Sequence, residues 1–132
     1  MVKIKFLIST IISIILLFFL LSFFYSTTFY NQCNLGCGYW YDREGKRLFG
    51  PNDIIIPPYI EEFDYNATYI VVKQKPLQQR EEIQYERIYD YPMGRDSIYY
   101  WIINKREHKS WGPILNEEYY SILKKERINI KL

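Results

Sequence analysis

The chain has 132 residues, with 17 basic and 15 acidic side chains and a formal net charge of +2. Lys3 and Lys5 precede a long apolar stretch, so the remaining 15 basic residues balance the 15 acidic ones and the rest of the chain is neutral. A neutral domain lacks the basic surface that binds phosphate backbones, which excludes nucleic acid as an expected partner. Fourteen tyrosines and a single alanine (Ala67) favour strands over helices, and such usage is typical of an AT-rich bacterial genome.

The apolar stretch Phe6–Tyr25 contains no charged residue, glycine or proline. Twenty helical residues at about 1.5 Å each span roughly 30 Å, the thickness of the hydrocarbon core of a bilayer. The stretch therefore predicts a transmembrane helix. Lys3 and Lys5 precede it and no further positive charge follows until Arg43. This asymmetry predicts a cytosolic N-terminus and a C-terminal domain that is periplasmic or extracellular.

The sequence allows three alternatives for the processing of this N-terminal segment. A cleavable signal peptide usually has an apolar core of about 7–15 residues, shorter than this one, and Ser26–Thr28 fit a cleavage site poorly. A lipoprotein would be acylated at Cys33, although Tyr30 and Gln32 stand where a lipobox has leucine and a small residue. The third alternative is an uncleaved signal anchor. We expect residues 1–32 to form this anchor segment and the remainder to form the extracytoplasmic domain.

Cys33 and Cys37 are the two cysteines of the chain. An exported location permits a disulfide between them, which would close a short loop and stabilise the domain at the low end of the usual range. Lipidation of Cys33 would leave Cys37 unpaired, so the disulfide and the lipid anchor exclude each other. His108 is the only histidine, which leaves no complete set of metal ligands, and we expect no metal and no cofactor.

After the leader, the pattern predicts a small, mostly antiparallel sheet. The two segments Ala67–Lys75 and Ile98–Asn104 are apolar on both faces and are expected to be central strands. Tyr59–Tyr65 is expected to be irregular or a single short turn, and Gly112 with Pro113 is expected to end the last hairpin. The predicted strands are Tyr39–Asp42, Lys46–Phe49, Ile54–Ile56, Ala67–Lys75, Ile83–Asp90, Ile98–Asn104 and Lys109–Trp111.

Asn116–Arg127 predicts the one helix of the domain. Asn116 is expected to be its N-cap, and the acidic first turn and basic last turn both complement the helix dipole. Ile128–Leu132 is expected to add a short edge strand. The predicted fold class is α+β: an N-terminal transmembrane helix, then a small, mostly antiparallel β-sheet domain with one C-terminal helix packed on the sheet. The residues expected to pack on the sheet are Leu115, Tyr119, Ile122 and Leu123.

Two groups of side chains are candidates for acid–base chemistry. Glu61, Glu62 and Asp64 form the one compact acidic cluster, and paired carboxylates can bind Ca²⁺ or hydrolyse glycosides. Their spacing matches no calcium loop, and a solvated loop is the structural alternative. His108 is the one side chain available for histidine-dependent catalysis. It lies in the polar run Lys105–His108 at an expected hairpin tip, where a solvated turn residue is the alternative.

An aromatic group is predicted across one hairpin. Such side chains can stack on sugars or bases, or they can pack in the core and pair across strands. The chain has no glycine-rich phosphate loop and no nucleophile motif, so these side chains are the candidate interaction residues. The group comprises Tyr99, Tyr100, Trp101 and Trp111.

Several blocks along roughly Cys33–Ile130 form a recognisable pattern: CNLGCGYWY, IIPPYI, YIVVKQKP, YYWIINK, WGP and the final helix. In these blocks the chain resembles an uncharacterised family of small exported bacterial proteins, often found in Bacteroidetes and classed as a domain of unknown function. The blocks include no catalytic signature. The resemblance implies an exported, lipoprotein-like or singly anchored, β-rich domain, and it supplies no activity.

We therefore expect a membrane-tethered extracytoplasmic domain that is not an enzyme and that binds another envelope or secreted protein. The anchor and the lack of a catalytic constellation motivate this hypothesis. An immunity protein that protects against a secreted toxin is one alternative, because small neutral domains are common in that role. A hydrolase of envelope glycans that uses Glu61, Glu62 or Asp64 is another.

Overall fold

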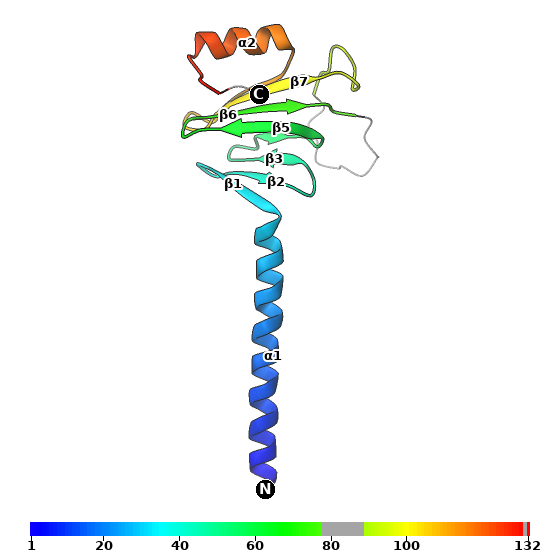
Figure 1. The fold of residues 1–132 in the computed structure, drawn as a ribbon, viewed down its shortest axis with the longest axis vertical. Helices are drawn as coiled ribbons and strands as arrows, with labels where there is room; N and C mark the ends of the chain where they lie inside the picture. The colour runs from blue at the N-terminus through cyan, green and yellow to red at the C-terminus, as the bar shows by residue number, and fades with distance from the viewer. Residues whose placement is uncertain (78–88, 131) are drawn as a thin grey trace. The chain divides into compact units, whose positions relative to one another are not determined.

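The computed structural model describes residues 1–77, 89–130 and 132, with the side chains of residues 27–30 outside this description. The chain divides into two compact units, Met1–Gln32 and Cys33–Leu132, each described by itself below. Figure 1 traces both units in order along the chain.

The first unit is the single helix α1, Val2–Tyr30. Every residue from Met1 to Ser26 is exposed, although most of these side chains are apolar. The hydroxyls of Thr10, Ser13 and Ser26 each donate to a carbonyl of the preceding turn, at 2.9–3.0 Å. Such bonds satisfy a hydroxyl where no water is present. By length and composition the helix is able to cross a membrane, a test that a signal sequence also passes.

The second unit contains two four-stranded antiparallel sheets and one helix. The strands follow one another in sequence order in each sheet, and residues 75–98 form the long connection between β6 and β7. The C-terminal helix is α2, Asn116–Lys125. The first sheet comprises β1 (Gln32–Gly36), β2 (Tyr39–Asp42), β3 (Arg47–Phe49) and β4 (Ile55–Ile56). The second comprises β5 (Ile60–Tyr65), β6 (Tyr69–Gln74), β7 (Tyr99–Asn104) and β8 (Lys109–Ile114).

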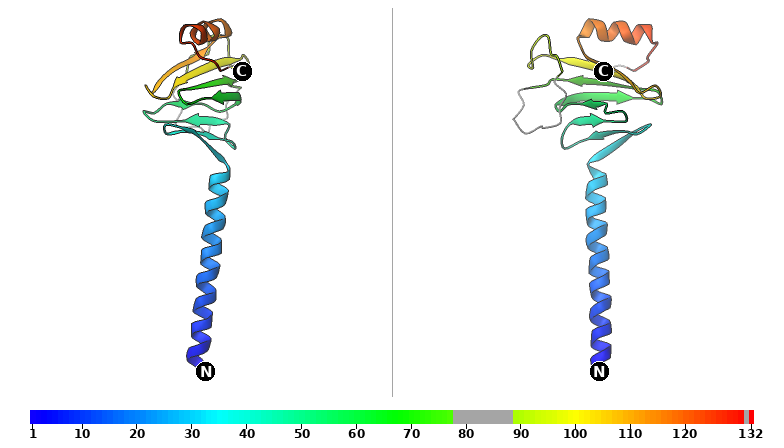
Figure 2. Two further views of the ribbon diagram at one scale, coloured as in Figure 1. Left: turned by 60° about the vertical axis from the view of Figure 1, so that its left-hand side comes forward. Right: turned by 180° about the vertical axis from the view of Figure 1, so that it is seen from behind.

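The two central strands of the second sheet, β6 and β7, are covered on both faces, which explains their apolar pattern. Side chains alternate along a strand, so Ile70 and Val72 face the first sheet whereas Val71 faces α2. Figures 1 and 2 show α2 and the first sheet on opposite sides of β5–β7. The core between the sheets contains Leu35, Tyr39, Leu48, Ile56, Ile60, Ile70, Val72, Trp101 and Ile103. The core under α2 contains Val71, Ile102, Ile114, Tyr119, Leu123, Ile128 and Ile130.

The predicted α+β class, the two central strands and the C-terminal helix are confirmed, with two sheets in place of the one expected. The strand β1 was not predicted. The prediction for Tyr59–Tyr65 is wrong, because Ile60–Tyr65 forms β5 and pairs with β6. The exposed charged side chains of this segment are typical of a loop, but an edge strand such as β5 also tolerates them. The strand predicted at Ile83–Asp90 falls mainly on residues 78–88, which lie outside the described residues.

Three predictions at the C-terminal end are also wrong. Strand β8 runs through Gly112 and Pro113 to Ile114, since a proline on an edge strand costs no ladder bond. Leu115 is the N-cap of α2 and is 38% exposed, so it does not pack on the sheet, and Asn116 is the first helical residue. Residues 128–130 form no strand, because Ile128 and Ile130 fold back into the core under α2.

Tyr119 is the most strongly perturbed titratable side chain in this core. It is fully buried and stacks on Tyr100, with the ring centroids 4.3 Å apart. Its hydroxyl makes no hydrogen bond within ordinary geometric limits among the described residues. Burial raises the pKa of Tyr119 to about 12, with further increases from Tyr120, Tyr100 and Glu62, while the nearby backbone of Leu132 lowers it.

We expect Tyr119→Phe to unfold no more easily than the wild type at pH 7, because the change removes a buried hydroxyl that makes no hydrogen bond of ordinary geometry. Unfolded tyrosine ionises near pH 10, whereas folded Tyr119 ionises near 12. Its contribution is fully present below pH 10 and is lost as the pH rises to 12, a loss on the order of 2–3 kcal/mol. Urea unfolding at pH 9 and 12 should show a smaller loss in the phenylalanine variant than in the wild type. An equal loss in both proteins would contradict the assignment.

Candidate functional site

Two turns from different sheets meet at one place in the second unit. One is the β1–β2 turn, centred on Cys37, and the other is the β7–β8 turn, residues 105–108. The ammonium of Lys105 donates to the carbonyl oxygen of Leu35, and the Tyr39 hydroxyl lies 3.1 Å from Nδ1 of His108. We call Cys37, Tyr39, Lys105 and His108 the turn cluster.

The β1–β2 turn holds the Cys37 thiol at the surface. Gly36, Cys37 and Gly38 all have positive φ, at 86°, 54° and 83°, a region that glycine enters freely and cysteine does not. The amide of Gly36 donates to Oδ1 of Asn34 at 2.8 Å and fixes the start of the turn. Cys37 is exposed, and the ammonium of Lys105 would lie 3.3 Å from a Cβ placed on Gly36.

Lys105 lies beneath this turn and is only 3% exposed. The sequence predicts it to be part of a polar tip, which is wrong. Oδ1 of Asn104 accepts the amides of Arg106 and Glu107, both at 3.1 Å, and so caps the turn immediately around Lys105. The lysine ammonium lies 5.4 Å from the centroid of the Tyr65 ring. Burial lowers the pKa of Lys105, and an ionised Cys37 raises it in part.

Tyr39 and His108 connect the two sheets through one hydrogen bond. Tyr39 is fully buried, and its pKa is raised by burial and then by Cys37. A tyrosine with a raised pKa keeps its proton and can donate it to Nδ1, which leaves the hydrogen of the neutral imidazole on Nε2. His108 is half-buried, so it is neither a fully solvated turn residue nor an isolated acid–base group.

The cluster brings together an exposed thiol, a buried ammonium and a bonded phenol–imidazole pair. Cys37 and His108 were candidates from the sequence, whereas Tyr39 and Lys105 were not. The one local signal for the site was the cysteine between two glycines.

The other half of the cysteine prediction concerns Cys33. It is half-buried and packs against the core between the sheets, and both thiols are unpaired in the structure. Neither the disulfide nor the lipid on Cys33 is tested by this arrangement, and both stay predictions.

The predicted aromatic group does not form one surface. Tyr99 is fully buried and Trp101 is 2% exposed, so neither can stack on a ligand. Tyr100 and Trp111 instead pack against the core under α2, on the opposite face of the sheet from Trp101. Trp111 is half-buried, with the Lys109 ammonium 4.7 Å from the centroid of its ring. These contacts correspond to core packing and strand pairing.

Glu61, Glu62 and Asp64 are all exposed on the edge strand β5. Among the described residues no three His, Cys, Asp or Glu side chains are placed to hold a metal ion. A general-acid carboxyl is usually kept in an apolar pocket, and these carboxyls are in solvent. Exposed charges on an edge strand oppose pairing with another chain, which gives this cluster a structural role.

A groove of about 400 Å³ lies beside the end of α2. Leu123 and Ile128 are the buried residues of its lining, and Tyr120 is 49% exposed. Lys124 and Arg127 are exposed, and neither makes an ion pair with another described residue. We call this feature the helix groove. Its lining consists of Tyr120, Leu123, Lys124, Arg127, Ile128 and Asn129.

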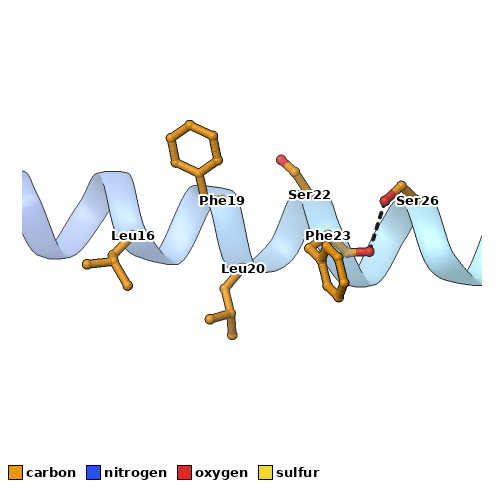
Figure 3. Close-up of a pocket in the computed structure, with 6 residues that line it drawn as sticks. All are labelled: Leu16, Phe19, Leu20, Ser22, Phe23 and Ser26. Atoms are coloured by element: carbon orange, nitrogen blue, oxygen red, sulfur yellow. Dashed lines mark hydrogen bonds between the residues drawn. The ribbon is translucent and has the colours of Figure 1, made fainter.

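A second hollow, of about 630 Å³, lies on the surface of α1 (Figure 3). Its lining is almost wholly apolar, and the Ser26 hydroxyl bonds back to its own helix, as the dashed line in Figure 3 shows. No set of polar groups converges there, so this hollow suits lipid tails or another apolar helix. It is lined by Leu16, Phe19, Leu20, Ser22, Phe23 and Ser26.

Comparison with known proteins supports the family resemblance. Residues 42–132, more than half of the chain, match DUF3997, which is described as a protein of unknown function. The match includes Lys105 and His108 and begins after Cys37 and Tyr39. Comparison with curated proteins finds no significant match, and comparison with solved structures finds none either. The bacterial source, the Bacteroidetes and the lipoprotein character stay predictions. The chain belongs to the DUF3997 family of proteins of unknown function.

Proposed function

We propose that this protein is a membrane-tethered domain outside the cytosol that binds another envelope or secreted protein and has no enzymatic activity. The exposure of α1 is the observation that carries the tether. Every residue from Met1 to Ser26 is exposed, and the segment Val2–Ser26 is long and apolar enough to cross a bilayer. Removing about 25 such residues from water requires a lipid or protein partner.

The distribution of basic residues around α1 supports the orientation with the N-terminus in the cytosol. Lys3 and Lys5 flank the N-terminal end of the helix, and no basic residue follows until Arg43. Positive flanks stay in the cytosol, so the second unit is exported. A bacterial source makes the destination the periplasm or the cell exterior.

A reporter fused after Leu132 tests the orientation. Alkaline phosphatase, which folds only outside the cytosol, should be active, and a β-galactosidase fused at the same position should be inactive. The same pair of fusions on a chain that lacks residues 1–31 should show the reverse pattern and serves as the control. Activity of the β-galactosidase fusion on the full chain would overturn the orientation.

The helix groove is the surface that we assign to the partner. Its apolar floor can bury one large side chain, while Lys124 and Arg127 have no counter-ion within the described part of the chain. Interfaces of this kind combine an apolar anchor with complementary charge at the rim. The partner segment is therefore acidic, with an aromatic or aliphatic side chain among its carboxylates.

We expect Lys124→Glu with Arg127→Glu to weaken binding of an acidic peptide with one central phenylalanine by about tenfold, because two attractive rim charges become repulsive. The same variant should bind better a peptide in which lysines replace the acidic residues. Fluorescence anisotropy of the labelled peptides, with the full chain in detergent, measures both affinities. Arg43→Glu with Lys46→Glu makes the same change in net charge in the turn between β2 and β3 and is the control. Equal effects of the two double variants would reject the groove as the binding surface.

A further inference from the structure

The hollow on α1 lies beside both large and small side chains. Phe19 and Phe23 are four residues apart, so their rings lie on the same face of the helix, one turn after the other. Figure 3 shows Ser22 and Ser26 along the same side of the helix as Phe19. The short serine side chains leave a recess of about 630 Å³ next to two projecting rings. One face of the helix therefore carries both a projection and a recess.

The Ser22 hydroxyl in this hollow has no partner within its own helix. The Ser26 hydroxyl donates to the carbonyl of Phe23 at 3.0 Å, whereas Ser22 makes no side-chain hydrogen bond with any described residue. Ser22 lies within the span Val2–Ser26, where hydrocarbon offers a hydroxyl no water. Lipid tails in the hollow would leave this hydroxyl without an acceptor. A second helix would present carbonyl and hydroxyl oxygens to it, so the hydroxyl favours a protein occupant.

We propose that this face of α1 binds the same face of a second copy of the chain, so that the protein is a parallel dimer in the membrane. Such a dimer goes beyond the tether proposed above and requires it. Copies inserted in the same orientation hold Ser22 and the two phenylalanines at the same depth. A ring of each helix then enters the recess of the other, a self-complementary contact that closes as a twofold pair. The Ser22 hydroxyl donates to an oxygen atom of the facing helix.

The charge of the second unit also favours a second copy as the occupant. The second unit has 15 basic and 15 acidic residues, so two copies carry no net charge that would keep them apart. A second copy is moreover inserted in the same membrane by the same anchor, which supplies a partner of fixed orientation for every chain.

Oxidative cross-linking in membranes tests the contact face. The background is Cys33→Ser with Cys37→Ser, so that an introduced cysteine is the one thiol present. Ser26→Cys, in the hollow, should give a disulfide-linked dimer and leaves the Ser22 hydroxyl in place. Phe24→Cys is the control, because it lies at nearly the same depth but about 200° around the helix. It should give about tenfold less dimer, since a disulfide forms only between residues that lie close together.

Sedimentation equilibrium of the full chain in detergent measures the dissociation constant of the dimer. Ser22→Ala should raise it about threefold through loss of the hydroxyl. Ser22→Leu should raise it by about tenfold or more, because leucine fills the recess. Ser13→Leu makes the same change on the opposite side of the helix, about 180° away, and should leave the constant unchanged.

The outcomes distinguish the dimer from the tether. Alkaline extraction shows whether the wild-type chain is integral to the membrane. A chain that stays in the alkaline pellet but cross-links equally at the two cysteine positions, or at neither, would overturn the dimer and leave the tether intact. A Ser22→Leu variant that dimerises as tightly as the wild type would also overturn the dimer. A wild-type chain in the soluble fraction would overturn both.

Discussion

Replacing Trp101 with alanine is expected to lower the free energy of unfolding of the second unit by about 3–5 kcal/mol. Trp101 is 2% exposed in the core between the two sheets, with the Tyr89 ring edge-on to it at 4.9 Å. Its indole nitrogen donates to Oε1 of Gln74 at 2.7 Å. Alanine would leave both a cavity and a buried amide oxygen without this donor, and the two losses act in the same direction.

Two further variants divide this effect into its parts. Trp101→Phe keeps most of the ring and removes the indole hydrogen bond, so its cost should be about 1–3 kcal/mol. Trp111→Ala removes a half-buried tryptophan and should cost less than Trp101→Ala. Urea unfolding followed by far-ultraviolet circular dichroism measures all three. A smaller loss for Trp101→Ala than for Trp111→Ala would contradict the position of the core.

The second large effect concerns the anchor. Ile14→Arg with Ile15→Arg is expected to release the protein from the membrane fraction or to prevent its insertion. Both residues lie near the middle of Val2–Ser26, where each arginine costs about 2.5–3.5 kcal/mol on insertion scales. Alkaline extraction followed by centrifugation and immunoblotting separates integral from soluble protein.

The control for this experiment is Ile14→Leu with Ile15→Leu, which keeps both positions apolar and should stay in the pellet with the wild type. An arginine variant that remains in the alkaline pellet would show that another part of the chain holds the membrane. A wild-type protein found in the soluble fraction would contradict the anchor itself.

The sequence predicted the elements whose residues have one clear pattern. Central strands β6 and β7 are apolar on both faces because a sheet lies on one side and a helix on the other. The acidic first turn and basic last turn of α2 likewise identify a helix without tertiary information. Strand β5 was missed because Glu61, Glu62 and Asp64 carry the charges of a loop, while only Ile60 and Phe63 pack inward.

The turn cluster could not be predicted from local sequence patterns. The Tyr39–His108 and Leu35–Lys105 contacts each join residues about 70 positions apart, so they depend on how the two sheets pack together. A polar run such as Lys105–His108 suggests a solvated tip, and only the tertiary structure shows that its first residue is buried. The same holds for Tyr99 and Trp101, whose neighbours in sequence gave no indication of which face is covered.

The central claim is that an intact anchor holds an exported domain with an unmodified Cys33. The intact mass of the protein, purified from the membrane fraction and measured under reducing conditions, tests this claim most directly. We predict the mass of the unprocessed chain, 16.1 kDa, allowing for removal of the first methionine. A mass that lacks the residues before Cys33, with or without acyl groups on that cysteine, would contradict it.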